Sequence, residues 1–280
     1  MKKINKIRCM PLLLTLILIV MMSAPTTSMA AQPTVNLGTT SKYAVLAGSA
    51  ITNTGTTTIN GSVGGDIGLY PGTAFDGKAS VVVSGTVNVA NDIARVAKDD
   101  LVVAYDDAAG RLPVKTIPTE LGGTTLYPGV YESASGTFEI TGTLTLDAKG
   151  DPEGVFVFKT ASTLVTAENS NVNLINSARF CRTFWKVGTS ATLGTNSHFV
   201  GHIFALTSIT ATTGATIQGQ LLARNGAVTL DNNTITNGIC ETITGGVLPQ
   251  TSTNLYNLLL MGVALAIIGA VGWRSRKLYE

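Results

Sequence analysis

A repeat of about twenty residues dominates the second half of the chain. Residues 191–201 are followed, eighteen residues on, by a chemically similar stretch at residues 209–219, and a shortened copy begins at Val228. In each copy short polar side chains, mostly threonine, alternate with apolar ones, and a Gly or Asn marks the bend. This pattern predicts a β-solenoid, in which each coil buries its inward side chains by stacking on its neighbours. Outward side chains would then repeat about every 4.7–4.9 Å from coil to coil.

Residues 91–110 follow a different period from the strands on either side. Apolar side chains recur there at helical spacing, with Asp, Lys and Arg between them, at Ile93, Val96, Ala97, Leu101, Ala104, Tyr105 and Ala108. Asn91 can cap the start of a helix of about five turns, and Gly110 can end it. Because a single helix must lay its apolar stripe on an apolar partner, we expect it along the side of the solenoid. The sequence therefore predicts an all-β solenoid with one long helix packed against it.

The first 31 residues have the organisation of a secretory signal peptide. A basic start is followed by an apolar run at residues 12–22 and by small residues at 28–31. Residues 32–243 are then expected to form one extracellular solenoid domain.

The other end of the chain has the order of a surface anchor. A polar linker, residues 244–254, precedes an apolar segment, residues 255–273, and a basic tail, residues 274–280, which should stay in the cytoplasm. The linker contains a short motif made of Leu248, Pro249, Gln250, Thr251 and Ser252. Motif, apolar segment and tail together resemble the signal by which sortase attaches proteins to Gram-positive cell walls, although Ser252 stands where that signal has glycine. The sequence thus predicts anchoring at the cell surface, either in the peptidoglycan wall or in the membrane.

Charge and cysteine content limit the possible partners. Between residues 32 and 251 there are 12 basic and 16 acidic residues, so this region carries a formal charge of −4. Without a basic patch, nucleic-acid binding has no electrostatic basis. Cys181 and Cys240 are the two cysteines outside the signal peptide. In an oxidising compartment they are expected to form a disulfide, and two buried thiols are the alternative.

Polar residues with catalytic or metal-binding chemistry are sparse. Asp and Glu are scattered singly through predicted turns, whereas polysaccharide-cleaving solenoids need clustered carboxylates. His198 and His202, four residues apart, would share one face of a strand, but no third ligand lies beside them. Trp185 is interpreted as a packing residue. We therefore expect no enzyme activity, no metal and no cofactor.

Several stretches together resemble one known family. Residues 184–195, 199–201, 203–215 and 219–231 are similar to the ice-binding proteins of the discontinuous β-solenoid type, which occur in bacteria, fungi and algae of cold habitats. Upstream, residues 43–47, 105–111 and 126–131 carry the same resemblance, which therefore spans residues 35–238. It implies a right-handed solenoid of triangular section. Its first and last coils would meet out of sequence order, with the helix along one side.

The resemblance also implies a flat ice-binding face with Thr-(Ala/Gly)-x-(Thr/Asn) motifs, which residues 54–57, 166–169 and 213–216 fit. Independently, the repeat offsets place Thr192, Thr210 and Thr229 in one outward row, and Thr195, Thr213 and Asn232 in the next. Leu193, Ala211 and Leu230 would point inward. The candidate ice contacts are Thr54, Thr57, Thr166, Asn169, Thr192, Thr195, Thr210, Thr212, Thr213, Thr216, Thr229 and Asn232. Glu168 puts a charge where faces of this family are usually neutral, and Gln220 is expected on a different face.

Threonine suits contact with a crystal lattice. It offers a methyl and a hydroxyl on a stem with restricted χ1, so little entropy is lost on docking, and many weak contacts act together. The predicted function is that of a monomeric, cell-surface ice-binding protein whose partner is the ice crystal surface. It would inhibit ice growth or recrystallisation, or attach the cell to ice. An adhesin for a glycan or another surface is the alternative, and outward threonines can also reflect strand propensity alone.

Overall fold

The computed structural model describes residues 32–61, 63–238, 240 and 262. The chain divides into two compact units, Met1–Cys240 and Glu241–Glu280, and the fold below belongs to the first. The predicted signal peptide, the sorting motif and the basic tail lie outside the described residues, as does the apolar segment apart from Gly262. No helix within the described ranges is long and apolar enough to cross a membrane.

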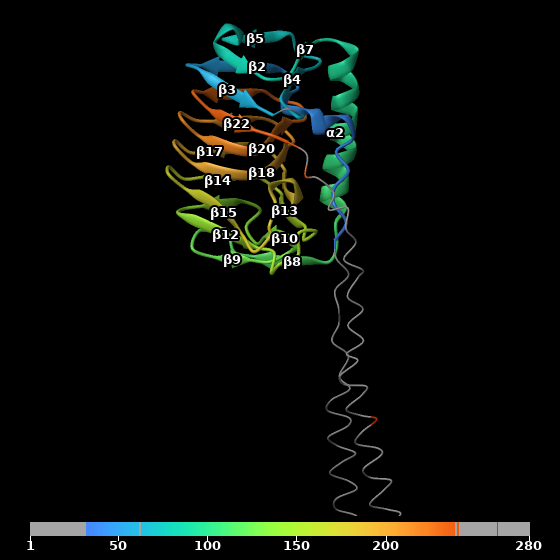
Figure 1. Ribbon diagram of the computed structural model, residues 1–280, viewed down its shortest axis with the longest axis vertical. Coiled ribbons are helices and arrows are strands. Elements are labelled where there is room, and N and C mark those ends of the chain that lie inside the picture. Colours follow the sequence, from blue (N-terminus) through green and yellow to red (C-terminus); the bar gives the residue numbers. More distant parts are fainter. Residues whose placement is uncertain (1–31, 62, 239, 241–261, 263–280) are drawn as a thin grey trace, which may run out of the picture. The chain divides into compact units, whose positions relative to one another are not determined.

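Short parallel strands stack as the coils of a solenoid, and they line three faces (Figure 1). The seven-stranded face consists, in spatial order, of β11 (Phe138–Ile140), β14 (Leu164–Thr166), β17 (Ala191–Leu193), β19 (Ile209–Ala211), β21 (Val228–Asp231), β2 (Ala50–Thr54) and β5 (Ala74–Asp76). All the pairings along it are parallel. The predicted β-solenoid is therefore confirmed.

The other two faces belong to one 15-stranded sheet that bends. The hydroxyl–amide face contains β9 (Thr125–Leu126), β12 (Thr143–Asp147), β15 (Asn171–Ile175), the first halves of β18 (His198–Ala205) and β20 (Thr216–Ala223), β22 (Thr234–Thr236), β3 (Thr57–Asn60) and β6 (Val81–Val83). The helix-covered face contains β8 (Val114–Ile117), β10 (Gly129–Ser133), β13 (Phe156–Thr160), β16 (Thr183–Val187), the second halves of β18 and β20, β1 (Tyr43–Ala47), β4 (Asp66–Leu69) and β7 (Val87–Val89).

Glycine makes the bend between these two faces. Gly201 in β18 and Gly219 in β20 have φ of 113° and 144°, and they pair with each other. A Cβ on Gly219 would lie 2.0 Å from the carbonyl oxygen of Gly201, so no side chain fits there. The bend also separates the two histidines. His198 is exposed on the hydroxyl–amide face and His202 is buried beyond the bend, so the prediction that they share one face is wrong.

The coils are not stacked in sequence order. β21 is the last strand of the seven-stranded face in sequence order, yet it pairs with β2, and β20 pairs with β1. The chain therefore starts in the middle of the stack and builds one end up to β7. It then crosses to the other end through α2 (Asp92–Gly110), which runs along the side of the solenoid (Figure 1). This arrangement confirms the predicted discontinuity and the position of the helix.

The helix packs through a stripe of small residues. The Asn91 side chain accepts a hydrogen bond from the Ala94 backbone N–H (2.9 Å) and so caps the N-terminus, as predicted. The buried stripe includes Ala97, Leu101, Ala104 and Ala108, and it lies on apolar side chains of the solenoid such as Leu46, Phe184, Phe204 and Leu222. Alanine side chains let the helix axis approach the sheet closely, which buries the large residues opposite.

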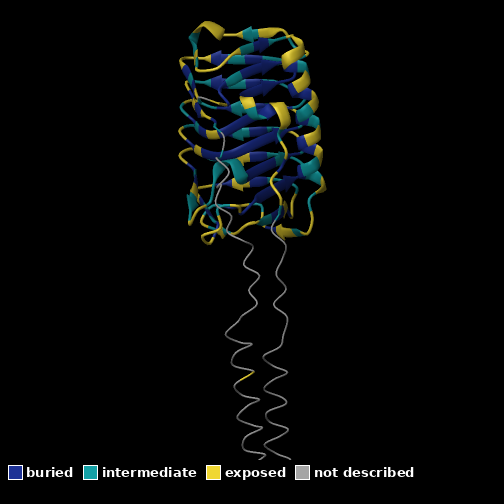
Figure 2. Cartoon of the chain, turned by 45° about the vertical axis from the view of Figure 1, so that its right-hand side comes forward, coloured by how far each residue is buried: buried dark blue, intermediate teal, exposed yellow. Residues whose placement is uncertain are grey.

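Inside the solenoid, apolar residues form stacked ladders, and aromatic rings stack as well. The Phe158 ring lies 4.0 Å from Trp185 and 5.4 Å from Tyr131, centroid to centroid, and the Trp185 indole N–H donates to the Val200 carbonyl (3.0 Å). Trp185 is therefore a core residue, as interpreted from the sequence. Figure 2 shows strands that are mostly buried or half-buried, with exposed residues gathered in the turns.

Two further sequence expectations can be compared with the structure. Cys181, in the short helix η3 (Phe180–Arg182), is bonded to Cys240 across a Cα–Cα distance of 5.9 Å, so the predicted disulfide is confirmed. Gln220 is fully buried, and its Nε2 donates to the Thr40 and Tyr43 carbonyls (2.7 and 2.5 Å). The expectation that Gln220 is a surface position is wrong, because the side chain holds η1 (Gly38–Lys42) and β1 against the last coil.

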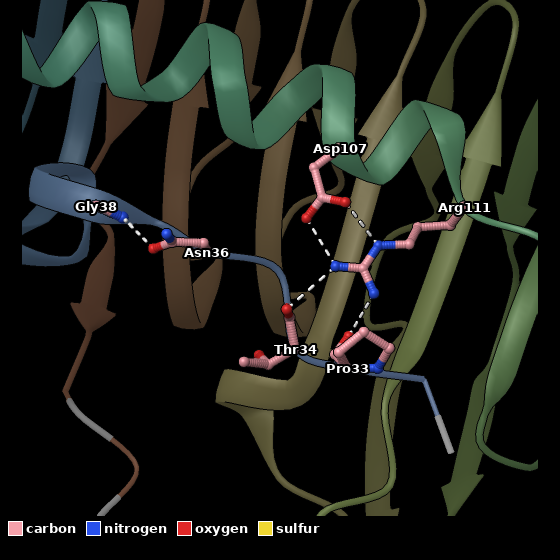
Figure 3. A network of polar contacts seen from close by, with 6 residues as sticks. All are labelled: Pro33, Thr34, Asn36, Gly38, Asp107 and Arg111. Carbon is pink, nitrogen blue, oxygen red and sulfur yellow. Dashed lines mark hydrogen bonds and ion pairs between the residues drawn. The ribbon is translucent and has the colours of Figure 1, made fainter. Parts of the chain in front are cut away.

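The residues before η1 are held to the helix by one guanidinium group (Figure 3). Arg111 donates to both carboxylate oxygens of Asp107 (2.8 and 2.7 Å) and to the carbonyls of Pro33 and Thr34 (2.5 and 3.1 Å). Charge-assisted, bidentate hydrogen bonds of this kind are the stronger ones in proteins. The Arg111 side chain is only 10% exposed, so solvent screens these bonds little.

We predict that Arg111→Ala lowers the free energy of unfolding by about 2 kcal/mol, because several hydrogen bonds to a charged group are lost. Urea unfolding of the two proteins measures this difference. Arg95→Ala is the matched control, since Arg95 pairs with Asp92 and Asp99 on the exposed side of the same helix. Exposed ion pairs contribute little, so the control should unfold like the wild type. Equal effects of both substitutions would contradict the role assigned to Arg111.

The buried amine of Lys98 should make the free energy of unfolding depend on pH. Its amine, at the buried contact between α2 and β20, donates to the carbonyls of Ala223 and Arg224 (2.5 and 2.6 Å). Burial, with the positive charge of Arg224, lowers the pKa of Lys98 to about 7. A neutral amine still has two N–H donors for the two carbonyls.

An unfolded lysine has a pKa near 10.4, so between about pH 7 and pH 10 the unfolded chain binds more protons at this site than the folded protein. The free energy of unfolding should therefore rise with pH over that window. Lys98→Met lacks this titration. The stability of the wild type relative to the variant should increase by at most about 1.4 kcal/mol per pH unit. Urea titrations at several pH values test this, and a difference that stays constant with pH would refute the assignment.

Candidate functional site

A column of threonines runs across four coils of the seven-stranded face. Thr192 pairs with Thr210, Thr210 with Thr229, and Thr229 with Thr52. Each is the outward residue at the middle of its strand and is half-buried, while the residues on either side of it are buried. We call Thr192, Thr210, Thr229 and Thr52 the threonine column. The offsets in the sequence placed its first three members correctly in register.

A rigid apolar base supports the column. On one side of it lie Ala191, Ile209, Val228 and Ile51, and on the other side lie Leu193, Ala211 and Leu230. All seven are at most 1% exposed, and the three predicted to point inward do so. Because close-packed interiors resist displacement, the hydroxyls and methyls of the column keep a fixed spacing from coil to coil.

Thr52 was missed by the sequence analysis. It comes from the second strand of the chain, some 140–180 residues before its neighbours in the column, so no local repeat reveals it. The available signal was the out-of-order meeting of coils that the family resemblance implies. Under that arrangement Ile51-Thr52-Asn53 aligns with Val228-Thr229-Leu230.

A second row of side chains lies where these strands end and their turns begin. Its order comes from backbone hydrogen bonds: Asn196 N–H to Thr213 O (3.0 Å), Gly214 N–H to Asp231 O (3.0 Å) and Asn232 N–H to Thr54 O (2.9 Å). We call Thr195, Thr213, Asp231 and Thr54 the turn row. Its next neighbour beyond Thr195 is Glu168, since the Asn169 N–H donates to the Thr195 carbonyl (2.9 Å).

Asn232 does not belong to the turn row, so its predicted position above Thr213 is wrong. With Asn196 and Gly214 it forms the following row, in which φ is 52°, 53° and 72°. The turn after β21 is one residue shorter than the turn after β19, because Thr212 has no counterpart there. The offset thus changes from 19 residues in the strand to 18 in the turn, which brings Asp231 into line.

Three predicted contacts have hydroxyls that serve the fold. The Thr166 hydroxyl accepts from the Gly194 N–H (2.9 Å), and the Thr57 hydroxyl accepts from the Asn233 N–H (3.1 Å). These side chains are 4% and 0% exposed, so neither can touch a surface. The half-buried Thr212 donates to the Leu193 carbonyl (2.7 Å) and lies behind the turn row. The sequence motif does not distinguish inward from outward threonines.

Two other predicted contacts lie off the threonine column. Thr216 is on the hydroxyl–amide face, where its Oγ1 is 2.6 Å from His198 Nδ1. Asn169 is exposed in the turn and has a φ of 55°. Thr54, Thr195 and Thr213 lie with the column on the same side of the turn.

Carboxylates border this site. The threonine column is continued by Asp76 above Thr52, and by Val165 and then Glu139 below Thr192. Within the turn row Asp231 accepts a hydrogen bond from the Thr213 hydroxyl. The site is therefore a flat strip of threonines, four coils long and limited by acidic groups. Within the described ranges, no three His, Cys, Asp or Glu residues are grouped so as to hold a metal ion.

The family model, the related sequences and the solved structures all indicate the same family. A family model described as ice-binding-like matches residues 45–236. An ice-binding protein from Nostoc sp. (strain HG1) is 45% identical over 203 residues, which cover 72% of this chain and 73% of that protein.

Solved structures agree. The crystal structure of an ice-binding protein from an Antarctic biological consortium has a TM-score of 0.72 and 41% identity, covering 77% of this chain and 96% of that one. The ice-binding protein of the Antarctic ascomycete Antarctomyces psychrotrophicus has a TM-score of 0.68 and 40% identity, covering 72% and 98%. Sequence, fold and strand order together show that the chain belongs to the ice-binding-like family.

Proposed function

We propose that this protein adsorbs to ice through the threonine column and the turn row, and so restrains the growth of the crystal. The observation that carries the proposal is the unbroken register of Thr192, Thr210, Thr229 and Thr52 over four coils. The names of the related proteins support it. An ice surface repeats regularly, as such a column does.

The physical basis is an array of weak contacts on a stiff support. Each outward threonine presents a methyl and a hydroxyl whose χ1 is restricted, so adsorption orders little that was free before. The coil spacing of about 4.8 Å fixes the distance between successive contacts. Simultaneous engagement of all members makes detachment rare although each contact is weak. Ice that grows between adsorbed molecules must then curve, which lowers its local freezing point.

The composition of the site also bears on two alternative functions, an enzyme and a glycan adhesin. The site lacks a group of carboxylates or a nucleophile–base pair, and we propose that the protein is not an enzyme. An adhesin for a glycan is the second candidate, but the strip carries no aromatic platform among its four threonines and the turn row. Ice affinity purification separates the two functions, since a glycan adhesin stays in the liquid.

We further propose that residues 1–31 direct secretion and that residues 244–280 keep the protein at the cell surface as a monomer. Attachment would use either sortase and peptidoglycan or residues 255–273 in the membrane. The last residue of the solenoid unit, Cys240, is bonded to Cys181 in η3.

We predict that Thr210→Tyr removes most thermal hysteresis and changes the shape of growing ice crystals, because the ring lifts the strip off the lattice. Stability should change by no more than about 0.5 kcal/mol, as is usual for surface substitutions, because the half-buried Thr210 side chain points outward. Val103→Tyr is the matched control, because Val103 is 62% exposed on the outer side of α2. Full activity of folded Thr210→Tyr would show that the threonine column does not touch ice.

A second substitution tests the charge in the turn row. Asp231→Asn keeps an oxygen that can accept from the Thr213 hydroxyl but removes a charge that holds its hydration water strongly. We predict a higher thermal hysteresis than the wild type at equal concentration. Asp99→Asn, on the exposed side of the helix, should change nothing. A loss of activity in Asp231→Asn would instead mean that the carboxylate is needed beside ice.

A further inference from the structure

We propose that the hydroxyl–amide face is a second ice-contacting plane, so that the protein meets ice with two adjacent faces of its solenoid. This inference rests on the proposed function and extends it to a surface of whose outward residues the sequence analysis named only Thr216 as an ice contact. It is carried by the register of side chains on six successive coils.

Two outward columns run side by side on this face. The first column consists of Thr143, Asn171, His198, Thr216, Thr234 and Thr58, all in register from coil to coil. The second column consists of Thr145 and Asn173, and then Val200, Gln218, Thr236 and Asn60. Val200 is only 8% exposed and packs with the core, so it interrupts the exposed polar groups of this column. The pairing of Asn171 with His198 aligns the two parts of the second column. Ten of these twelve side chains are hydroxyls or amides.

The two columns form a lattice in two dimensions. Neighbouring coils lie about 4.8 Å apart, and residues i and i+2 of a strand about 6.6 Å apart. On the seven-stranded face each three-residue strand offers one outward residue at its middle, and only β2 and β21 extend further, to Thr54 and Asp231. By this measure the hydroxyl–amide face is the more regular array.

A flat, fully apolar layer lies beneath the lattice. Between the columns, Leu144, Val172, Phe199, Ile217, Ile235 and Ile59 point inward and are at most 3% exposed. The hydrogen bond of 2.6 Å between His198 and Thr216 restricts two members of the first column. This face is therefore as stiff as the one that carries the threonine column.

Charge distinguishes the two faces. None of the twelve side chains is a carboxylate, an ammonium or a guanidinium group, and Asp147 at the end of β12 lies beside them. On the other strip Asp231 lies within the turn row, and Glu168 borders it. An ice surface carries no net charge, and charged groups resist loss of their hydration water. The neutral face thus complements ice better than it complements a charged partner such as an acidic glycan.

The two faces are also continuous. The turn between them is clamped by Asn233, whose buried side chain donates to the carbonyls of Thr212 and Ala215 (2.8 and 3.2 Å). It is so short that only two residues per coil separate the turn row from the first column. These are the row of Asn196, Gly214 and Asn232 and the buried row of Ser197, Ala215 and Asn233. Both planes are consequently held at one fixed angle, and we expect them to engage two different planes of a crystal.

The test compares single substitutions on each face. Thr234→Tyr alters the first column, because Thr234 is exposed between Thr216 and Thr58. Thr210→Tyr alters the threonine column, and Val103→Tyr on α2 is the control. The fluorescently labelled solenoid, residues 32–243, is adsorbed to a single-crystal ice hemisphere, and the stained planes are mapped together with thermal hysteresis. Circular dichroism and urea unfolding establish that each variant is folded.

We expect the wild type and Val103→Tyr to stain two sets of planes. Thr210→Tyr should lose one set and Thr234→Tyr the other, each with a several-fold loss of thermal hysteresis, and the double variant should stain none. If Thr234→Tyr stains and inhibits like the control while Thr210→Tyr does not, the second plane is refuted and the proposed function stands. If the wild type stains no plane, the proposed function itself fails. A change of oligomeric mass in Thr234→Tyr without any change on ice would assign this face to a second copy and also refute the inference.

Discussion

The solenoid depends on the parallel backbone ladder that joins its last coil to its first coils. β20 pairs with β1, β21 with β2 and β22 with β3, each across more than 170 residues of chain. Buried amides reinforce this junction: Gln220 donates to η1 and β1, and Asn237 donates to the carbonyls of Tyr43 and Gly64 (3.3 and 3.0 Å). Such contacts at great sequence separation fix the register in which Thr229 meets Thr52. Without this junction the threonine column would end at Thr229, so the junction determines the length of the proposed ice-binding strip.

Much of the fold could be predicted because its signals are local. The alternation around residues 191–219 specifies strands, the stripe from Ala97 to Ala108 specifies a helix, and two cysteines in a domain expected to be secreted predict a disulfide. The junction is different, because backbone pairing between β21 and β2 leaves no local pattern in either strand. Only the family resemblance indicated it, and Thr52 was missed since the repeat was followed in sequence order alone.

The candidate site could be predicted less well, because threonine has two uses in this molecule. Thr192 and Thr210 point outward. The hydroxyls of Thr166 and Thr57 instead accept hydrogen bonds from backbone N–H groups at the coil corners. A corner threonine satisfies a buried donor and stiffens the turn, which is a structural role of the same residue type in the same motif. The deletion of one turn residue after β21 has a similar effect. It changes which residue lies over Thr213 without altering the pattern of the strands.

The position of α2 determines how many faces of the solenoid are open to a partner. Packing α2 along one side buries Leu46, Phe184, Phe204 and Leu222, so that side has no free lattice of short polar groups. The disulfide and η3 lie at the border of the same side, through the contact of Phe180 with His202 (ring centroids 6.1 Å apart). The two remaining faces share the stiff corner at Asn233 and carry evenly spaced hydroxyls and amides, with Asp231 as a charged member of the turn row. A solenoid that uses one face to pack its helix can thus keep two faces for contact with a crystal, and the corner at Asn233 sets the angle between them.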